Sequence, residues 1–309
     1  MKISVVIPLF NKAASISRSV QSVLDQSYKD FELIVVDDGS TDDGGSIVNN
    51  YYDERISLIR QNNSGVSAAR NTGIKHATGN LIAFLDADDS WKPDFLKTIL
   101  RLSKNFPNAG LYATAYQINL SNHKIRNPLF HGISESPWEG IVSNYFKSAT
   151  FGDPPVCASA VAIPYAVLID SGGFQLGKRM GEDLDLWGRI ALKYSIAFSS
   201  QVQAIYHQDA ENRACNYFIN GDEHPFVDTI TLMREQGDNM STNADDLDLY
   251  IVKLISENVR QYVLANKYKD ARLLAKKING RGFYLRRLIW GSYLNIITHL
   301  IWKIRKFLS

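Results

Sequence analysis

Residues 3–41 read ISVVIPLFNKAASISRSVQSVLDQSYKDFELIVVDDGST. Two apolar runs rich in Val and Ile, at 3–9 and 31–37, flank a helix-like segment at 14–26. Strands of a parallel sheet that is covered on both faces lose the alternation of polar and apolar residues, because both faces are buried. The stretch therefore predicts a strand–helix–strand unit with parallel strands.

The same alternation continues along the chain. Strand-like runs lie at 56–60 and 81–86, and a helix-like segment lies between them at 66–76. In sheets of this type ligands bind beyond the carboxyl ends of the strands. The polar residues at those ends should meet in one crevice, and they are Asn11, Asp37 to Thr41, Asn62 to Gly65, and Asp86 to Asp89.

The second half of the chain is less regular. We expect strands at 110–119 and 156–163, a helix containing residues 181–192, and helices at 246–265, 268–278 and 283–308. These patterns divide the 309 residues into a catalytic domain at 1–215, a polar, loop-rich connection at 216–245 and a basic helical region at 246–309. The predicted fold class is α/β, with a Rossmann-like, mostly parallel sheet, helices on both faces and a C-terminal helical appendage.

The formal net charge of +2 conceals an asymmetry. Residues 253–309 hold 13 Lys+Arg against 2 Asp+Glu, whereas residues 1–252 hold 21 against 30. A basic tail on an acidic body indicates an anionic partner surface, either membrane or nucleic acid. No base-reading motif accompanies the tail, so we expect no nucleic-acid partner.

The last predicted helix favours a membrane surface. Only fifteen uncharged residues separate Arg287 from Lys303, and a spanning helix needs about 17 to 25. We expect peripheral contact, with Trp290, Tyr293 and Trp302 at headgroup depth. The alternative is a helix packed on the body of the protein.

Two cysteines, Cys157 and Cys215, form neither a disulfide framework nor a CxxC pair, as is typical of a reducing compartment. The N-terminus has no basic region followed by a long apolar run and a cleavage site, so we expect no export. The expected location is cytoplasmic, on the inner face of the cytoplasmic membrane.

The strand-like run at 81–86 ends with Asp86, and two further carboxylates, Asp88 and Asp89, follow it. Two carboxylates one residue apart can give a hard divalent ion one or two ligands and leave its other positions for phosphate oxygens. The alternative is an Asp-rich turn that caps the next helix. The residues alone do not separate these interpretations.

Asp37 and Asp38 end the strand-like run at 31–37, where a carboxylate can accept hydrogen bonds from a ribose or a base. A glycine-containing turn is the alternative. The chain contains no G-x-G-x-x-G after its first strand and no G-x-x-x-x-G-K-[ST], which argues against NAD-binding and P-loop functions.

Three segments in this order and spacing resemble glycosyltransferase family 2, the inverting enzymes of GT-A fold. They are SVVIPLFNKAASISRSVQSVLDQSYKDFELIVVDDGSTDD, NSGVSAARNTGIKHATGNLIAFLDADDSW and GEDLDLWGRIAL. The resemblance covers residues 3–195 approximately. It implies a nucleotide-sugar donor, most simply a UDP-sugar, and Mn²⁺ or Mg²⁺ as cofactor.

The resemblance also implies roles for residues on the donor side. Pro8 and Phe10 would line the nucleobase site, and Asp38 would hydrogen-bond the base with Asp37 close by. Arg70 would lie near the phosphates or shape the site. Asp86 would face the ribose and the metal.

Further roles concern the metal and the acceptor. Asp88 would ligate the metal, with His207 as a third ligand, and Asp183 would be the general base beside Glu182. An inverting transfer needs such a base, because the acceptor hydroxyl loses its proton as it attacks the anomeric carbon. The alternative for Asp183 and Glu182 is that they are simply acids in the first turn of a helix, where the helix dipole favours negative charge.

The sequence suggests roles in ligand binding for three more residues without deciding them. Arg213 could contact the diphosphate. Trp91 and Trp187 could stack on a sugar, although large aromatic side chains are more often in the core.

The expected function is metal-dependent transfer of a hexose or N-acetylhexosamine to a hydroxyl of a lipid-linked or cell-surface glycan precursor, such as a lipopolysaccharide intermediate. One alternative is a polyprenyl-phosphate glycosyltransferase, which shares the first domain. Another is a silent scaffold that binds sugar nucleotides. The oligomeric state is not predicted.

Overall fold

The computed structural model describes residues 1–122, 124–208, 224–237 and 243–276. Its strands are β1 (Ile3–Leu9), β2 (Phe31–Asp37), β3 (Ile56–Arg60), β4 (Leu81–Phe84), β5 (Ser90–Trp91), β6 (Leu111–Asn119), β7 (Ile125–Arg126), β8 (Glu139–Ile141), β9 (Val161–Pro164) and β10 (Ile196–His207). Its helices are α1 (Ala13–Leu24), α2 (Gly44–Asn49), α3 (Val66–His76), α4 (Phe95–Asn105), α5 (Tyr145–Phe151), α6 (Tyr165–Asp170), α7 (Glu182–Lys193), α8 (Pro225–Glu235), α9 (Ala244–Leu264) and α10 (Tyr268–Lys276).

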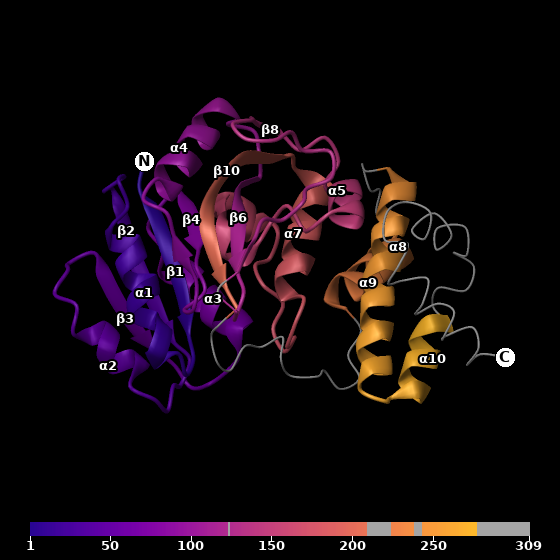
Figure 1. Ribbon diagram of the computed structural model, residues 1–309, viewed down its shortest axis with the longest axis horizontal. Helices are drawn as coiled ribbons and strands as arrows, with labels where there is room; N and C mark the ends of the chain where they lie inside the picture. Colours follow the sequence, from indigo (N-terminus) through magenta and orange to yellow (C-terminus); the bar gives the residue numbers. More distant parts are fainter. Residues whose placement is uncertain (123, 209–223, 238–242, 277–309) are drawn as a thin grey trace.

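The strands form one sheet with the main order β3-β2-β1-β4-β9-β6-β10-β5 (Figure 1). The first four neighbours in this order are parallel, with Ile3 of β1 opposite both Phe31 of β2 and Leu81 of β4. Their carboxyl ends therefore share one edge, which we call the donor edge because the residues expected to bind a sugar donor follow these strands. The predicted convergence of the polar segments after β1, β2 and β4 is confirmed.

The middle of the sheet departs from the parallel pattern. Strand β9 lies antiparallel between β4 and β6. The strand predicted at 156–163 is wrong over its first half, because Ala158–Ala160 form a 3₁₀ turn and β9 begins at Val161. The hydroxyl of Ser159 in this turn accepts a hydrogen bond from the Asp86 amide at 3.1 Å, which ties the turn to the end of β4.

Successive side chains of β1 enter two different hydrophobic clusters. Val5 and Ile7 pack with Ile16 of α1, whereas Val6 packs in the cluster that contains Ile74 of α3. Neighbouring residues of a strand point to opposite faces, so helices cover both faces of the sheet, as predicted. This explains the unbroken apolar run of β1.

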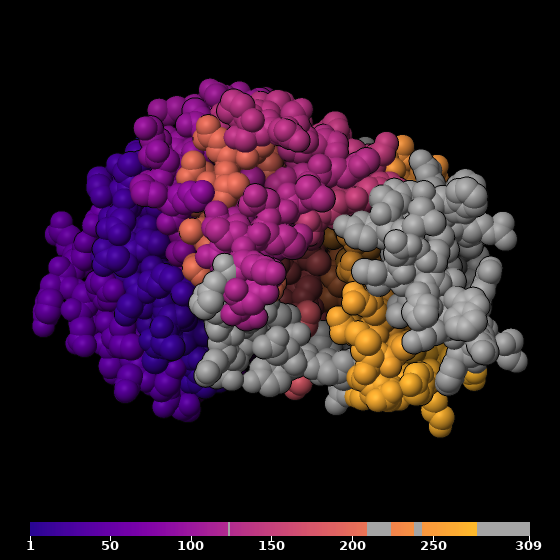
Figure 2. Space-filling model, in the orientation of Figure 1, coloured from indigo at the N-terminus to yellow at the C-terminus, as the bar shows by residue number. Residues whose placement is uncertain are grey.

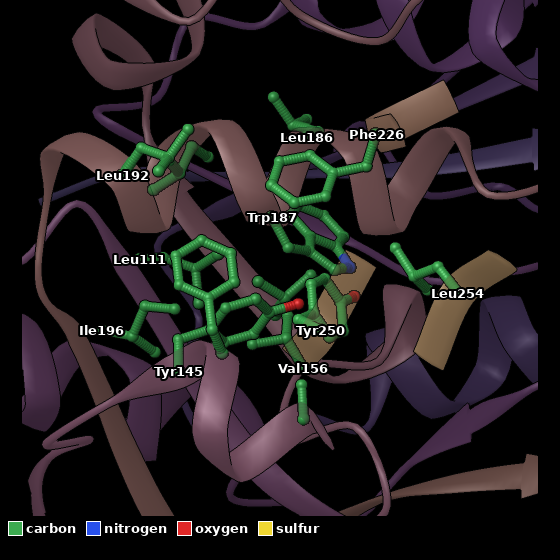
Figure 3. Close-up of a cluster of buried hydrophobic side chains, with 14 of the residues drawn as sticks. Leu111, Tyr145, Val156, Leu186, Trp187, Leu192, Ile196, Phe226, Tyr250 and Leu254 are labelled. Carbon is green, nitrogen blue, oxygen red and sulfur yellow. The ribbon is translucent and has the colours of Figure 1, made fainter. Parts of the chain in front are cut away.

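The C-terminal helices stand at one end of the sheet, opposite β3 (Figures 1 and 2). The ring of Tyr250 in α9 lies 5.8 Å from that of Phe226 in α8 and 6.1 Å from that of Tyr145 in α5. Leu254 is 2% exposed, and Trp187 of α7 is fully buried in the same cluster (Figure 3). Helix α9 is therefore part of the main core.

Helices α8, α9 and α10 make up most of the described C-terminal region. The segment 216–245 was expected to be loop-rich, but α8 occupies Pro225–Glu235 because its apolar face, including Phe226 and Ile230, is buried against the body. The helices expected at 246–265 and 268–278 correspond to α9 and α10, whereas the one expected at 283–308 lies outside the described residues. Among the helices of residues 1–122, 124–208, 224–237 and 243–276, none is sufficiently long and apolar to cross a membrane.

Candidate active site

The donor edge begins with the tip of β1, where Pro8 is half-buried and Phe10 is 45% exposed. Asn11 follows with a positive φ of 50°. Its side-chain oxygen accepts a hydrogen bond from the Thr41 amide at 2.8 Å, and its own amide donates to the Ser40 hydroxyl at 3.1 Å. These hydrogen bonds join the loops that follow β1 and β2. The ring of Phe10 remains exposed at this edge of the sheet.

Asp37 and Asp38 organise the loops next to this tip. Asp37 accepts a hydrogen bond from the Ser40 amide at 2.9 Å. Asp38, which is 3% exposed, accepts from the Gln61 side chain at 2.6 Å and from the amides of Ser64 and Gly65 at 2.9 and 2.8 Å. Asp38 thus fixes the loop that leads into α3. The expected hydrogen bond to a nucleobase stays a prediction.

Each of the three carboxylates after β4 has its own partner from the chain. Asp86 accepts from Arg70 at 2.8 Å, and Asp88 accepts from Lys12 at 2.7 Å. Asp89 accepts from the Ser159 hydroxyl at 2.5 Å and from the His207 amide at 2.9 Å. Mutual repulsion of the three is therefore relieved by two cations and by hydrogen bonding.

Asp89 is fully buried, and its contacts join the end of β4 to β10 and to the 3₁₀ turn. Burial raises the pKa of Asp89 well above its usual value, and the neighbouring charges of Asp88 and Asp86 raise it further. A carboxyl in this position supports the donor edge and does not face a ligand.

The expected metal ligands Asp86, Asp88 and His207 are not assembled as a set. The Nε2 atom of His207 lies 2.9 Å from the Ser90 hydroxyl. Over the described part of the chain, no group of three or more His, Cys, Asp or Glu residues is placed to hold a metal ion. The ring of His207 contacts Ser90 at the β5–β10 pairing, and its role as a third ligand stays a prediction.

Asp86 and Asp88 nevertheless offer hard oxygen donors at the open edge, with side chains 30% and 14% exposed. Mg²⁺ is typically bound by one or two carboxylates together with substrate phosphates. The two side chains fit a divalent ion of that kind, completed by oxygens of a bound diphosphate.

The opposite wall of the crevice is the start of α7. Gly181 has a positive φ of 77°, and this left-handed turn brings Glu182 and Asp183 into the first helical turn. Asp183 and Asp86 both line a cavity of about 390 Å³. The expected base and the expected donor-side carboxylate therefore face the same space.

Arg70 connects the two walls. Its guanidinium is 3% exposed and donates to Asp86 at 2.8 Å and to Glu182 at 2.7 Å, and it lies 5.1 Å from the centre of the Phe174 ring. In this structure Arg70 shapes the site through carboxylates, which is one of its two expected roles.

The buried cation Arg70 interacts electrostatically with three carboxyl groups, those of Asp86, Glu182 and Asp183. Burial and the charge of Asp183 raise the pKa of Glu182 to about 7, although Arg70 acts in the opposite direction. Burial also raises the pKa of Asp183, again against the effect of Arg70. Asp183 can thus take up a proton more readily than an ordinary aspartate, which suits a general base.

The rest of the cavity lining comes from segments in which the sequence indicated no functional residue. It carries, among others, Lys178, Arg179, His224, Glu257, Asn258 and Gln261. Glu257, Asn258 and Gln261 lie on the polar side of α9, whose other side, which includes Val259, is in the core. No local motif marks them, because only the docking of α9 brings them to the cavity.

The remaining residues for which we expected ligand contacts do not line the cavity or lie outside the described residues. Trp91 is 5% exposed, stacks on Phe95 at 4.0 Å and donates to the Ser159 carbonyl, and Trp187 is fully buried. Both are core residues, and neither is among the residues that line the cavity. Arg213 lies outside the described residues. Lys12 and Ser159 were missed, since neither stands in a recognisable pattern.

The fold agrees with comparisons with known proteins. The solved structure of Staphylococcus aureus TarS 1-349 in complex with UDP-GlcNAc has a TM-score of 0.65 and 19% identity, over 85% of this chain and 72% of that one. Glycosyltransferase GlyA of Streptococcus pneumoniae is 34% identical over 190 residues, which are 59% of this chain and 27% of GlyA.

A second curated relative is TuaG of Bacillus subtilis, a glycosyltransferase named for teichuronic acid biosynthesis. It is 45% identical over 98 residues, which are 31% of this chain and 39% of TuaG. The matches thus span well under two thirds of either curated relative. The family model described as Glycosyl transferase family 2 matches residues 4–163. Because this match covers more than half of the 309 residues, the chain belongs to glycosyl transferase family 2.

Proposed function

We propose that this protein is an inverting glycosyltransferase that moves a hexose or N-acetylhexosamine from a nucleotide-sugar to a hydroxyl group of a glycan precursor. One observation carries the proposal: Asp86 on the donor edge and Asp183 on α7 line the same cavity of about 390 Å³. Ligand pockets usually measure about 300–1,000 Å³, so a sugar fits between these two groups.

The donor edge suits a UDP-sugar. Phe10 offers an exposed ring beside the loops that Asp37 and Asp38 hold. The TarS structure was solved with UDP-GlcNAc, and the similarity of fold supports, by analogy, the same class of donor here. A divalent ion held by Asp86 and Asp88 would neutralise charge on the departing diphosphate.

Asp183 supplies the base for a single displacement. Its carboxylate removes the acceptor proton while the hydroxyl attacks the anomeric carbon from the face opposite the nucleotide. Glu182 and Arg70 hold the start of α7 against the donor edge through their ion pair. An α-linked donor therefore gives a β-linked product.

The acceptor enters from the side of α9. Asn258 and Gln261 line the cavity together with Tyr116, and amide and aromatic side chains of this kind bind sugar hydroxyls and ring faces. We propose a lipid-linked or cell-surface glycan precursor as the acceptor. The name of TuaG and the excess of 13 Lys+Arg over 2 Asp+Glu in residues 253–309 support this class and peripheral contact with a membrane.

The decisive experiment incubates the purified protein with a panel of nucleotide-sugars and membrane extract, in Mn²⁺, in Mg²⁺ and in EDTA. The proposal expects metal-dependent transfer from one UDP-sugar, with inversion seen by NMR of the product. A lipid monophosphate sugar as the product, recognised because mild acid releases its sugar, would indicate the polyprenyl-phosphate alternative. Donor binding by the wild-type protein without any transfer would favour the scaffold. In that case Asp183→Asn should behave like the wild type.

Membrane contact is tested separately. Deleting residues 282–309 should release the protein from vesicles that contain anionic lipids. Unchanged partitioning in a flotation assay would reject the tail as the membrane-binding segment.

A further inference from the structure

Lys12 stands at the donor edge, directly before α1. Its Nζ atom lies 2.7 Å from Oδ2 of Asp88, and both side chains are only 14% exposed. From the same helix, Arg18 donates to the backbone carbonyl of Asp88 at 2.6 Å. The carboxylate expected to ligate a divalent ion is thus already paired with a cation of the chain.

Two cations cannot share this carboxylate without cost. A divalent ion at Asp88 would meet the ammonium of Lys12 at close range, where partial burial weakens screening by solvent and salt. Asp86 is paired with Arg70, which also holds Glu182 at 2.7 Å and so belongs to the link between the two walls. At Asp88 it is the ammonium of Lys12 that a divalent ion would have to displace.

We infer that Lys12 is the resident counter-ion of Asp88 and that it competes with the divalent cation for this carboxylate. Without metal, the ammonium neutralises Asp88 and limits repulsion among Asp86, Asp88 and Asp89. When metal binds, the contact between ammonium and carboxylate is replaced by one between metal and oxygen, and no covalent bond changes. This inference rests on the proposed metal-assisted transfer.

The test measures Mn²⁺ binding to the full chain by electron paramagnetic resonance, with UDP present. Lys12→Met should lower the Mn²⁺ dissociation constant about tenfold, which corresponds to about 1.4 kcal/mol. The melting temperature of this variant should be lower than that of the wild type in EDTA and should rise more when Mn²⁺ is added. Lys12→Arg, which keeps the charge, should behave like the wild type.

Lys2→Met is a matched control. Lys2 lies next to β1 at the opposite edge of the sheet and pairs with Glu32, also at 2.7 Å. Its replacement should leave the Mn²⁺ dissociation constant unchanged. If Lys12→Met does not fold, Lys12→Gln provides a second neutral variant in which the side chain can still hydrogen-bond.

The inference is overturned if the neutral variants bind Mn²⁺ with unchanged or weaker affinity, or if neither they nor the wild type bind it. These results are distinguishable from failure of the proposed function. Intact transfer from a UDP-sugar with an unchanged Mn²⁺ constant would reject only the role of Lys12. Failure of UDP and of every UDP-sugar to bind the folded wild type would reject the donor site itself.

Discussion

The Nη1 atom of Arg70 lies 2.7 Å from Oε1 of Glu182, in an ion pair between α3 and α7 whose side chains are 3% and 9% exposed. The other terminal nitrogen of the same guanidinium donates to Asp86 at the donor edge. One buried cation therefore sets the spacing between the donor edge and the helix that carries Asp183. Sites built on such buried pairs lose much stability when one partner is removed.

Arg70→Met should destabilise the protein by about 3–5 kcal/mol, because two carboxyl groups lose their cation. The loss, measured by urea unfolding at pH 7, should be smaller at pH 5, since Glu182 has a pKa of about 7 and is then largely protonated. Arg55→Met is the control: its pair with Asp53 is 27% and 24% exposed and should contribute about 1 kcal/mol or less. Equal losses for the two variants would contradict the structural role of Arg70.

Asp183→Asn should lower kcat by a factor of about 10²–10⁴, the usual contribution of a general base. Binding of UDP should not change, because Asp183 lies on the wall opposite the donor edge. Asp170→Asn removes a carboxylate at the end of α6 that pairs with Lys193 at 3.1 Å, away from the cavity, and should keep full activity. Transfer at the wild-type rate by Asp183→Asn would remove this residue from the mechanism.

The pH profile of transfer should show the raised pKa of Asp183. A base acts only when deprotonated, so kcat/KM should fall as the pH falls through the pKa of the folded protein. Burial raises this pKa above 3.8, so the acid limb should lie at higher pH than for an exposed aspartate. An acid limb at or below pH 3.8, in a protein shown by circular dichroism to be folded there, would speak against this assignment.

Leu254→Ala should cost about 2–5 kcal/mol, although α9 lies in the C-terminal region. Leu254 is 2% exposed and belongs to the cluster around Trp187 and Phe226 (Figure 3). Leu273→Ala in α10 makes the same change at a side chain that is 66% exposed and should alter stability by no more than about 0.5 kcal/mol. Chemical denaturation compares the two, and similar small losses would show that α9 is not part of the cooperative core.

Much of the parallel half of the sheet could be predicted from the sequence. The runs at 3–9, 31–37 and 56–60 coincide with β1, β2 and β3, and the segment at 66–76 coincides with α3. These elements are encoded locally, because strands covered on both faces are continuously apolar. The clustering of Asp37, Asp86 and their neighbours then follows from parallel topology, since the carboxyl ends lie at one edge.

Other features depended on contacts between residues far apart in the chain. The 3₁₀ turn around Ser159 replaced part of an expected strand, because its hydroxyl is hydrogen-bonded to Asp89, 70 residues away. The expected ligand His207 pairs with Ser90 because β10 lies antiparallel to β5. Periodicity carries no information on such partners.

The sequence by itself determined the α/β class, the donor edge and the acids that line it, because those follow from local hydrophobic patterns and the chemistry of short motifs. Only the tertiary structure decided which cations neutralise these acids, Lys12 for Asp88 and Arg70 for Asp86 and Glu182. It also decided that residues of α9 line the cavity that Asp86 and Asp183 share. The physical reason is that ion pairing and burial depend on three-dimensional proximity, which the packing of the whole chain creates.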